Sequence, residues 1–143
     1  MAVVLLAVLL TDQLSKALAL RYLAGVPTTP IWPGVFHLTL VVNSGVAFGL
    51  FKGYGLLVTL VTLGLLALLL RSSLRAGAGP RTRWMRLGLG LILGGAGSNL
   101  LDRVRFGGVV DFLDFRVWPV FNVADSCVTI GAILLAWVLT RAR

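Results

Sequence analysis

Hydrophobic positions gather into four long segments, which charged residues, glycine and proline separate. Residues 53–70 form the clearest segment, because they carry no charge and are long enough to cross the hydrocarbon core of a membrane as a helix. Residues 87–101 reach that length only together with their charged flanks. The remaining segments are residues 2–22 and 121–140. The pattern therefore predicts four transmembrane helices.

Composition points to the same class of protein. Hydrophobic residues make up 58% of the 143 residues and charged residues 13%, whereas soluble domains have roughly 45–50% and 25%. A disordered chain, a collagen-like chain and a disulfide scaffold are excluded. We therefore expect a membrane all-α bundle in a single domain of residues 1–143. The first segment lacks the basic start and small-residue cleavage site of a removable signal peptide, so we expect a retained helix.

The chain carries 13 Lys and Arg against five acids, a formal net charge of +8. We expect no nucleic-acid partner, because the basic residues fall where the predicted helices leave the bilayer, where they set orientation and contact membrane lipids. Five arginines lie within residues 71–86 and mark this connection as cytoplasmic. With four crossings, both termini are then cytoplasmic, and residues 23–52 and 104–120 form outer loops.

The first outer loop has a pattern of its own. Residues 35–42 are rich in β-branched and aromatic residues and alternate in polarity, with Phe36 and Leu38 on one side and His37 and Thr39 on the other. This period of two is typical of a strand. We therefore expect a small extracytoplasmic β platform in the first outer loop.

Two ionisable residues interrupt the first predicted helix. An ionisable group inside a membrane span costs roughly a few kcal/mol unless it is paired or hydrated. Asp12 and Lys16 lie four residues apart on one helix face and can neutralise one another. They either pin this helix to its neighbours or contact a substrate directly.

The third predicted helix carries two stripes at helical spacing. Gly90, Gly94 and Ser98 recur every four residues and would let another helix approach closely. The neighbouring stripe combines an amide with two charges at the outer end of the helix, and we expect it to line a polar pocket. Its members are Gly95, Asn99, Asp102 and Arg103.

Two further aspartates, Asp111 and Asp125, lie on either side of the Trp118-Pro119 pair, which breaks any continuous helix. The chain can therefore turn back and bring the two carboxylates together. Two adjacent carboxylates retain one proton near neutral pH, so one can act as general base toward water and the other as general acid. We expect Asp114 to be exposed in the outer loop and dispensable. The residues alone leave a structural or ion-conducting role equally open.

Five short blocks distributed over the predicted spans give a more specific signal. In chain order they are Asp12-Gln13-Leu14-Ser15-Lys16, Asn43-Ser44-Gly45-Val46-Ala47-Phe48, Gly94-Gly95-Ala96-Gly97-Ser98-Asn99-Leu100-Leu101-Asp102-Arg103, Val109-Val110-Asp111-Phe112 and Phe121-Asn122-Val123-Ala124-Asp125. With these blocks the chain resembles the lipoprotein signal peptidases, or signal peptidase II, of bacteria over nearly its whole length. By this resemblance, the stretch from Asp111 to Asp125 is a few residues shorter than in many members. We expect this difference to affect the shape of the local loop and not the pair of aspartates.

The resemblance implies a membrane aspartic endopeptidase that removes the signal peptide of a prolipoprotein just before a diacylglyceryl-modified cysteine. Asp111 and Asp125 match the catalytic pair of the family. The resemblance implies no metal, no cofactor and no acyl-enzyme. We expect a monomer in the bacterial cytoplasmic (inner) membrane, with its active site toward the outer leaflet. Residues that would bind the substrate or support the site are, by the same resemblance, Asn43, Gly45, Asn99, Arg103, Asn122, Ala124, Asp12 and Lys16.

Other functions make different demands on the sequence. A serine or cysteine protease needs a nucleophile with a base, and His37, the only histidine, lies in a predicted strand without a Gly-x-Ser-x-Gly turn. A small transporter or proton channel would use Asp12, Lys16, Asp102 and Arg103 as a relay, but the sequence lacks the internal symmetry common in transporters. A lipid-binding factor without chemistry would not need two outer-facing aspartates.

Overall fold

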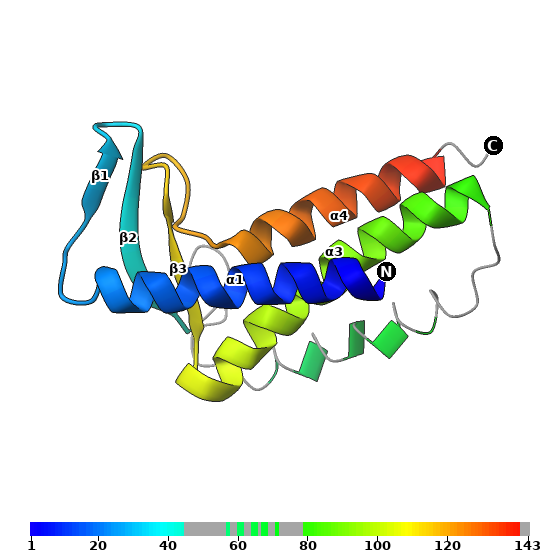
Figure 1. Cartoon of the computed structure of the whole chain (residues 1–143), viewed down its shortest axis with the longest axis horizontal. Helices are drawn as coiled ribbons and strands as arrows, with labels where there is room; N and C mark the ends of the chain where they lie inside the picture. Colours follow the sequence, from blue (N-terminus) through cyan, green and yellow to red (C-terminus); the bar gives the residue numbers. More distant parts are fainter. Residues whose placement is uncertain are drawn as a thin grey trace.

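The computed structural model describes residues 1–44 and 79–140, together with residues 57, 60, 61, 64, 65, 67, 68 and 71. Within this part of the chain, long helices lie side by side and a small sheet closes one end of them (Figure 1). The elements in chain order are α1 (Ala2–Tyr22), β1 (Thr29–Trp32), β2 (Phe36–Asn43), α3 (Pro80–Phe106), β3 (Val109–Asp114) and α4 (Val123–Thr140). The start of α1 and the end of α4 lie far from the sheet, at the other end of the helices (Figure 1).

Two of the helices, α1 and α4, are long and apolar enough to cross a membrane. The surface of α1 agrees with such a role. Leu6, Leu10 and Leu14 are more than half exposed, whereas the side chains it buries include Asp12 and Lys16. Apolar residues outside and charged residues inside suit a helix that is surrounded by lipid.

The third predicted helix is longer than its apolar segment at residues 87–101, because α3 continues through the charged residues on both sides. A proline lies in its first turn, and Gly107 ends it in a left-handed conformation with φ of 71°. Of the second predicted helix, residues 53–70, the structure describes only residues 57, 60, 61, 64, 65, 67 and 68, which are helical. The bundle of four helices therefore stays a prediction, whereas the helices and the small sheet are observed.

Glycines let α3 pack closely on both of its neighbours. A Cβ atom at Gly94 would lie 2.8 Å from the Cβ of Val8 on α1, and one at Gly90 would lie 3.1 Å from the Cβ of Val4 on the same helix. On the other side, a Cβ atom at Gly95 would lie 2.5 Å from the carbonyl oxygen of Ala124 on α4. The predicted close approach of a helix along the Gly90 and Gly94 stripe is confirmed, and that helix is α1.

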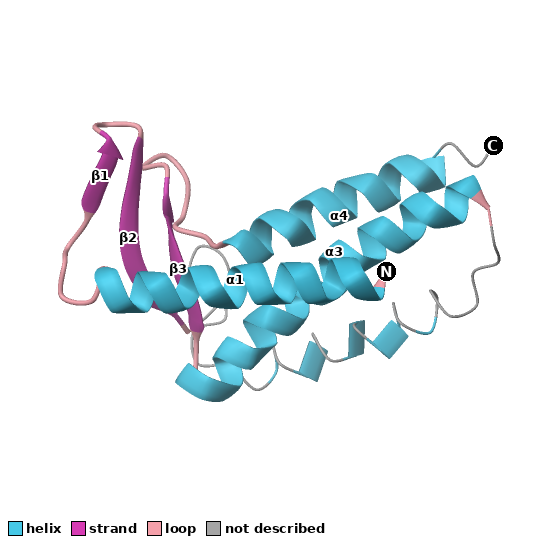
Figure 2. Cartoon of the chain, in the orientation of Figure 1, coloured by secondary structure: helices cyan, strands magenta, loops and turns pink. Residues whose placement is uncertain are grey.

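The sheet is antiparallel, with the order β1-β2-β3 (Figure 2). The strand predicted at residues 35–42 is β2. Its Leu38 and Leu40 pack against a small core that includes Ala19 of α1 and Phe112 of β3. The sheet is thereby attached to the helices at the end where α1 finishes.

The platform predicted in the first outer loop has a third strand, which comes from residues 104–120, the second predicted outer loop. The end of α3 takes up the first positions, and β3 then pairs with β2, with Val42 opposite Val110 and Val41 opposite Asp111. All but one of the residues of β3 are buried. A strand buried on both faces lacks the alternation of polarity by which β2 was predicted.

Candidate active site

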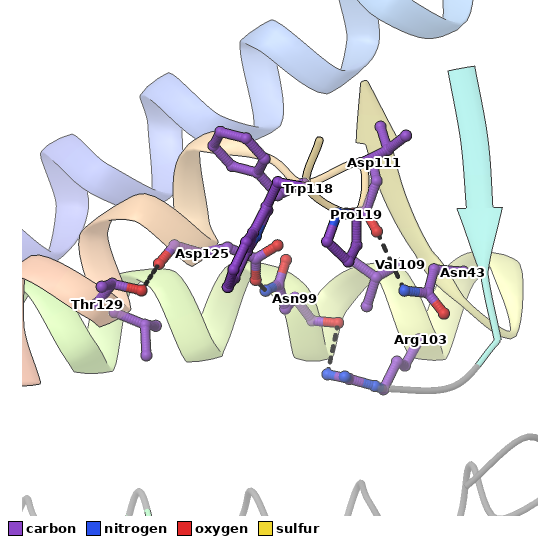
Figure 3. Close-up of a pocket in the computed structure, with 12 residues that line it drawn as sticks. Asn43, Asn99, Arg103, Val109, Asp111, Trp118, Pro119, Asp125 and Thr129 are labelled. Atoms are coloured by element: carbon purple, nitrogen blue, oxygen red, sulfur yellow. Dashed lines mark hydrogen bonds between the residues drawn. The ribbon is translucent and has the colours of Figure 1, made fainter. Parts of the chain in front are cut away.

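Asp111 and Asp125 line the same cavity, which has a volume of about 290 Å³ (Figure 3). Asp111 lies on β3, and Asp125 lies in the first turn of α4. Between them the chain turns back through residues 115–120, and the N–H of Phe121 donates to the carbonyl oxygen of Leu113 at 3.0 Å. The predicted return of the chain is therefore observed. The other lining residues are Asn43, Asn99, Arg103, Val109, Trp118, Pro119, Val120, Phe121, Val128 and Thr129.

Asn122 connects the two aspartates and is fully buried. Its Nδ2 donates to Oδ1 of Asp111 at 2.7 Å, and its Oδ1 accepts the N–H of Asp125 at 2.8 Å. In return, Oδ2 of Asp125 accepts the N–H of Asn122 at 3.4 Å. This reciprocal pair resembles a capping box, in which two side chains satisfy the free N–H groups at the start of a helix. The cap of α4 therefore also sets the position of Asp125.

Asp111 lies in an environment that disfavours its charged form. Only 3% of its surface is exposed. Burial and the negative charge of nearby Asp125 raise the pKa of Asp111 to about 7, although hydrogen bonds from Asn43 and Asn122 act in the opposite direction. The bond from Asn43 joins its Nδ2 to Oδ2 of Asp111 at 3.3 Å. A carboxyl group that titrates near neutral pH can both give and take a proton during a reaction.

Asn99 is the partner of Asp125 on α3. Its Nδ2 donates to Oδ1 of Asp125 at 2.8 Å, and its Oδ1 accepts a hydrogen bond from Nζ of Lys16 at 2.8 Å. The same Oδ1 accepts Nδ2 of Asn122 at 3.1 Å. These bonds give the Asn99 amide one orientation, with its nitrogen toward Asp125. Nη1 of Arg103 lies 3.4 Å from the carbonyl oxygen of Asn99, one turn earlier on α3 (Figure 3).

Behind the cavity, Lys16 lies between two carboxylates in a cluster shielded from solvent. Its Nζ is 2.6 Å from Oδ2 of Asp12 and 2.7 Å from Oδ2 of Asp102, and the exposed fraction of these side chains is at most 3%. Asp12 also accepts hydrogen bonds from Oγ of Ser98 and from the N–H of Ala124, both at 2.7 Å. The predicted pairing of Asp12 with Lys16 is confirmed, and it ties α1 to α3 and α4.

Asp102 and Gln13 extend this cluster to the sheet. Oδ2 of Asp102 accepts the N–H of Val110, the residue before Asp111, at 3.1 Å, and its Oδ1 accepts Nε2 of Gln13 at 2.9 Å. Of the polar stripe predicted on α3, Asn99 and Arg103 line the cavity, whereas Asp102 bonds to α1 and β3. Sequence analysis missed the role of Gln13, although Gln13 stands in the first of the quoted blocks.

The predicted site residues fall into two layers. Those that line the cavity beside the two aspartates are Asn43, Asn99 and Arg103. Those that are almost fully buried behind it are Asp12, Lys16, Asn122 and Ala124. Gly45 lies outside the described residues. The second layer therefore reaches the cavity through hydrogen bonds, by way of Asn99 and the first turn of α4.

Asp114 is not in the place that the sequence predicted. It is 5% exposed, and its carboxylate accepts Oγ1 of Thr39 at 2.7 Å and the N–H of Arg116 at 2.8 Å. Burial acts to raise the pKa of Asp114, but the hydrogen bonds from Thr39 and Arg116 outweigh it and hold the pKa below its ordinary value. The expectation of an exposed loop residue is wrong, because β3 carries this side chain against β2.

Several residues that line the cavity were not predicted as site residues from the sequence. Val128 and Thr129 follow Asp125 by three and four residues on α4, a spacing that places them on the same helix face and could have indicated them. Trp118 and Pro119 come from a non-helical connection, and no periodic pattern in the sequence predicts the path of such a connection. Among the residues that the structure describes, no group of three or more acidic, His or Cys side chains is arranged to hold a metal ion.

A cavity lined by two aspartates at one end of apolar helices is the arrangement expected of a membrane hydrolase of the aspartic type. Residues 4–141 match the family described as Signal peptidase (SPase) II, and the chain belongs to this family. The protein is accordingly an aspartic-type peptidase that cleaves the signal peptides of prolipoproteins.

Similar proteins agree in sequence and in fold. The lipoprotein signal peptidase of Halothermothrix orenii is 48% identical over 134 residues, which cover 93% of this chain and 90% of that protein. The lipoprotein signal peptidase of Pelotomaculum thermopropionicum is 44% identical over 137 residues, which cover 96% and 89%. A solved structure described as a bacterial membrane enzyme is similar with a TM-score of 0.84 at 28% identity, covering 97% of this chain and 86% of its own. Together with the apolar helices, this similarity identifies a membrane protein.

Proposed function

We propose that Asp111 and Asp125 are the catalytic pair with which this signal peptidase II hydrolyses the peptide bond before the diacylglyceryl-modified cysteine of a prolipoprotein. One observation carries the proposal. The two carboxylates line one cavity, and the Asn122 side chain forms hydrogen bonds with both residues. In such a pair, one carboxylate activates water and the other protonates the substrate, without a covalent intermediate.

The surroundings of the two aspartates support different roles for them. Asp125 accepts hydrogen bonds from Asn99 and Asn122 in the first turn of α4, where the helix dipole favours negative charge. Burial and the charge of nearby Asp125 raise the pKa of Asp111 to about 7, which favours Asp111 as the member that holds the shared proton. Asp125 is therefore the general base toward water, and Asp111 is the general acid.

The protons balance over the two steps of hydrolysis. As water attacks the scissile carbonyl carbon, Asp125 takes a proton from the water and Asp111 gives its proton to the carbonyl oxygen, which produces a gem-diol. When the C–N bond breaks, the leaving amine takes the proton from Asp125, and Asp111 recovers a proton from a hydroxyl group of the gem-diol. The pair thereby returns to its starting state.

Lys16 supports the base from a distance. Its ammonium group donates to Oδ1 of Asn99, which polarises the amide whose Nδ2 donates to Asp125. Because Lys16 also bonds to Asp12 and Asp102, the orientation of Asn99 is held from α1. These contacts support a positioning role for Asp12 and Lys16 rather than contact with the substrate.

The other site residues surround the scissile bond and the lipidated cysteine. Asn43, Asn99 and Arg103 present polar groups at the cavity. Arg103 orients the substrate and does not transfer protons, because a guanidinium group stays protonated. Gly45 is included among the substrate-binding residues by the family resemblance alone. Asn122 and Ala124 act through the start of α4. The Asn122 side chain accepts the N–H of Asp125, and the N–H of Ala124 donates to Asp12.

We also propose four transmembrane helices in a monomeric, single-domain protein of residues 1–143, embedded in the lipids of the bacterial inner membrane. Both termini are cytoplasmic and the cavity faces the outer leaflet. The five arginines within residues 71–86 support this orientation, because Arg81, Arg83 and Arg86 lie in the first turns of α3, which begins at the end of the helices away from the sheet (Figure 1). Single cysteines placed in residues 71–86 or 23–44, after replacement of Cys127 by Ala, test it in intact cells. An impermeant thiol reagent that labelled only the arginine segment would overturn it.

The function is tested with purified protein and a synthetic lipobox peptide, with and without the diacylglyceryl group on its cysteine. We expect cleavage before the cysteine of the lipidated peptide only, and no cleavage by Asp111→Asn. Equal cleavage of both peptides would remove the lipid requirement. Full activity of Asp111→Asn would remove the proposed pair.

A further inference from the structure

The connection between β3 and α4 forms one wall of the catalytic cavity. We call residues 115–120 the strap. Trp118, Pro119 and Val120 of the strap line the cavity together with both aspartates (Figure 3).

The two ends of the strap are fixed by the sheet. At its far end, Phe121 returns to β3, where its N–H donates to Leu113 and its carbonyl oxygen accepts the N–H of Leu113 at 2.8 Å. The Phe121 ring also stacks on Phe115, with ring centroids 5.9 Å apart. At its near end, the strap leaves β3 directly after Asp114. The conformation between these ends decides where the wall of the cavity lies.

That conformation begins with an unusual residue. Arg116 has φ of 65°, the only positive value at a residue other than glycine among those that the structure describes. A left-handed conformation costs free energy for a residue with a Cβ atom, so it persists where neighbouring contacts favour it. The contacts here are local. The N–H of Arg116 donates to Oδ1 of Asp114 at 2.8 Å, its Nη1 lies 3.3 Å from Oδ2, and the N–H of Val117 donates to the carbonyl oxygen of Phe115 at 2.7 Å.

Asp114 is itself held in place by the neighbouring strand. Its Oδ2 accepts Oγ1 of Thr39 on β2 at 2.7 Å, and its side chain is 8% exposed. The Arg116 side chain, by contrast, is 50% exposed, so the ion pair contributes less than the bond to the backbone N–H. Asp114 therefore connects β2 to the first turn of the strap by hydrogen bonds to both.

From these contacts we infer that Asp114 is a positioning residue for substrate recognition, which holds the strap so that Trp118, Pro119 and Val120 form the substrate-facing wall of the cavity. This inference rests on the proposed function of the cavity. Asp114 donates and accepts no proton in the reaction. Its loss displaces the wall and leaves the aspartate pair intact, so it weakens the binding of substrate and not the chemical step.

The experiment measures kcat and KM for the lipidated lipobox peptide in wild type, Asp114→Ala and Asp114→Asn. We expect KM to rise about tenfold in Asp114→Ala, because hydrogen bonds to a buried carboxylate are lost. The rise should be about threefold in Asp114→Asn, where an amide oxygen still accepts one N–H. We expect kcat to stay within about twofold, and the pH profile of kcat to stay unchanged, because the aspartate pair is untouched.

The matched control is Thr28→Val. Oγ1 of Thr28 lies 2.8 Å from Oγ1 of Thr39 at an exposed position, so this variant disturbs the same hydroxyl group without touching Asp114. We expect wild-type kcat and KM for it. If Asp114→Ala fails to fold by circular dichroism, the inference stands or falls on Asp114→Asn.

Two outcomes would overturn the inference. Wild-type KM in the folded Asp114 variants would show that the strap does not depend on Asp114. A fall in kcat at unchanged KM would show that Asp114 serves general stability or the chemical step. Asp111→Asn, measured beside them, separates this from the proposed function: loss of activity there together with wild-type KM in the Asp114 variants would contradict the inference alone.

Discussion

Nδ2 of Asn122 lies 2.7 Å from Oδ1 of Asp111, although Asn122 belongs to the cap of the helix that carries the other aspartate. The carboxyl group of Asp111 and the backbone of Asp125 are thereby held relative to one another by a single fully buried side chain. This relationship explains how a strand and a helix, joined by an irregular connection, can present two aspartates to one cavity.

As the proposed catalytic pair, the two aspartates should have non-additive effects on the reaction rate. We expect Asp111→Asn and Asp125→Asn each to reduce kcat by about 10³-fold or more, and the double variant to be scarcely worse, because either change removes a protonation state that the reaction requires. Single-turnover cleavage of the lipidated peptide measures this. Losses that multiplied in the double variant would indicate that the residues act independently.

The cluster around Lys16 should be a large contributor to stability. Lys16→Met leaves Asp12 and Asp102 buried without their cation, and we expect the free energy of unfolding to fall by about 3–5 kcal/mol. Thermal unfolding in detergent measures the change. Arg21→Gln, at an exposed position on the same helix, is the control and should stay within about 0.5 kcal/mol of wild type. Equal melting temperatures for Lys16→Met and wild type would contradict the pairing.

Arg103 and Arg105 form a matched pair for a test of substrate contact. Arg103→Lys keeps the charge in the cavity but loses the planar guanidinium group, so we expect cleavage to fall about tenfold or more. Arg105 is exposed and donates to Oε1 of Gln13 at 3.0 Å, away from the cavity, so Arg105→Lys should retain most activity. If the two variants cleave at the same rate, Arg103 is not a substrate contact.

The raised pKa of Asp111 predicts a dependence of stability on pH. An aspartate in the unfolded chain titrates near about 3.9, whereas Asp111 in the folded protein titrates at about 7. The folded state therefore binds the proton more tightly, so this contribution to stability is fully present at low pH. It is lost as the pH rises from about 4 through about 7. Melting temperatures across this range should fall more steeply in wild type than in Asp111→Asn, and identical slopes would contradict the shift.

Two glycines on α3 test the packing beneath the site. In Gly95→Ala the new Cβ would lie 2.5 Å from the carbonyl oxygen of Ala124 and would push the start of α4, with Asp125, away from α3. We expect a loss of about 1–3 kcal/mol of unfolding free energy together with reduced cleavage. Gly97→Ala meets nothing within 4 Å and should be neutral or slightly stabilising. Thermal unfolding and cleavage assays compare the two variants, and equal behaviour would contradict the packing.

The predicted elements that match the structure are those with a local pattern. α1 and α4 follow long apolar segments, and β2 follows an alternation of polarity that is visible along its own sequence. β3 could not be predicted in this way, because nearly all of its residues are buried, and the exposure of Asp114 was misjudged for the same reason. The quoted blocks nevertheless contained nearly every polar residue around the cavity.

By itself, the sequence determined the membrane class of the protein and its family and predicted the two aspartates of the proposed catalytic pair, because composition and short blocks of residues carry that information. Only the tertiary structure decided how the aspartates are surrounded. Lys16 and Asn99 stand 83 positions apart, yet their side chains meet within 2.8 Å behind Asp125. Such contacts arise where α1, α3 and α4 pack together, and no periodicity along a single helix specifies which side chains will meet there.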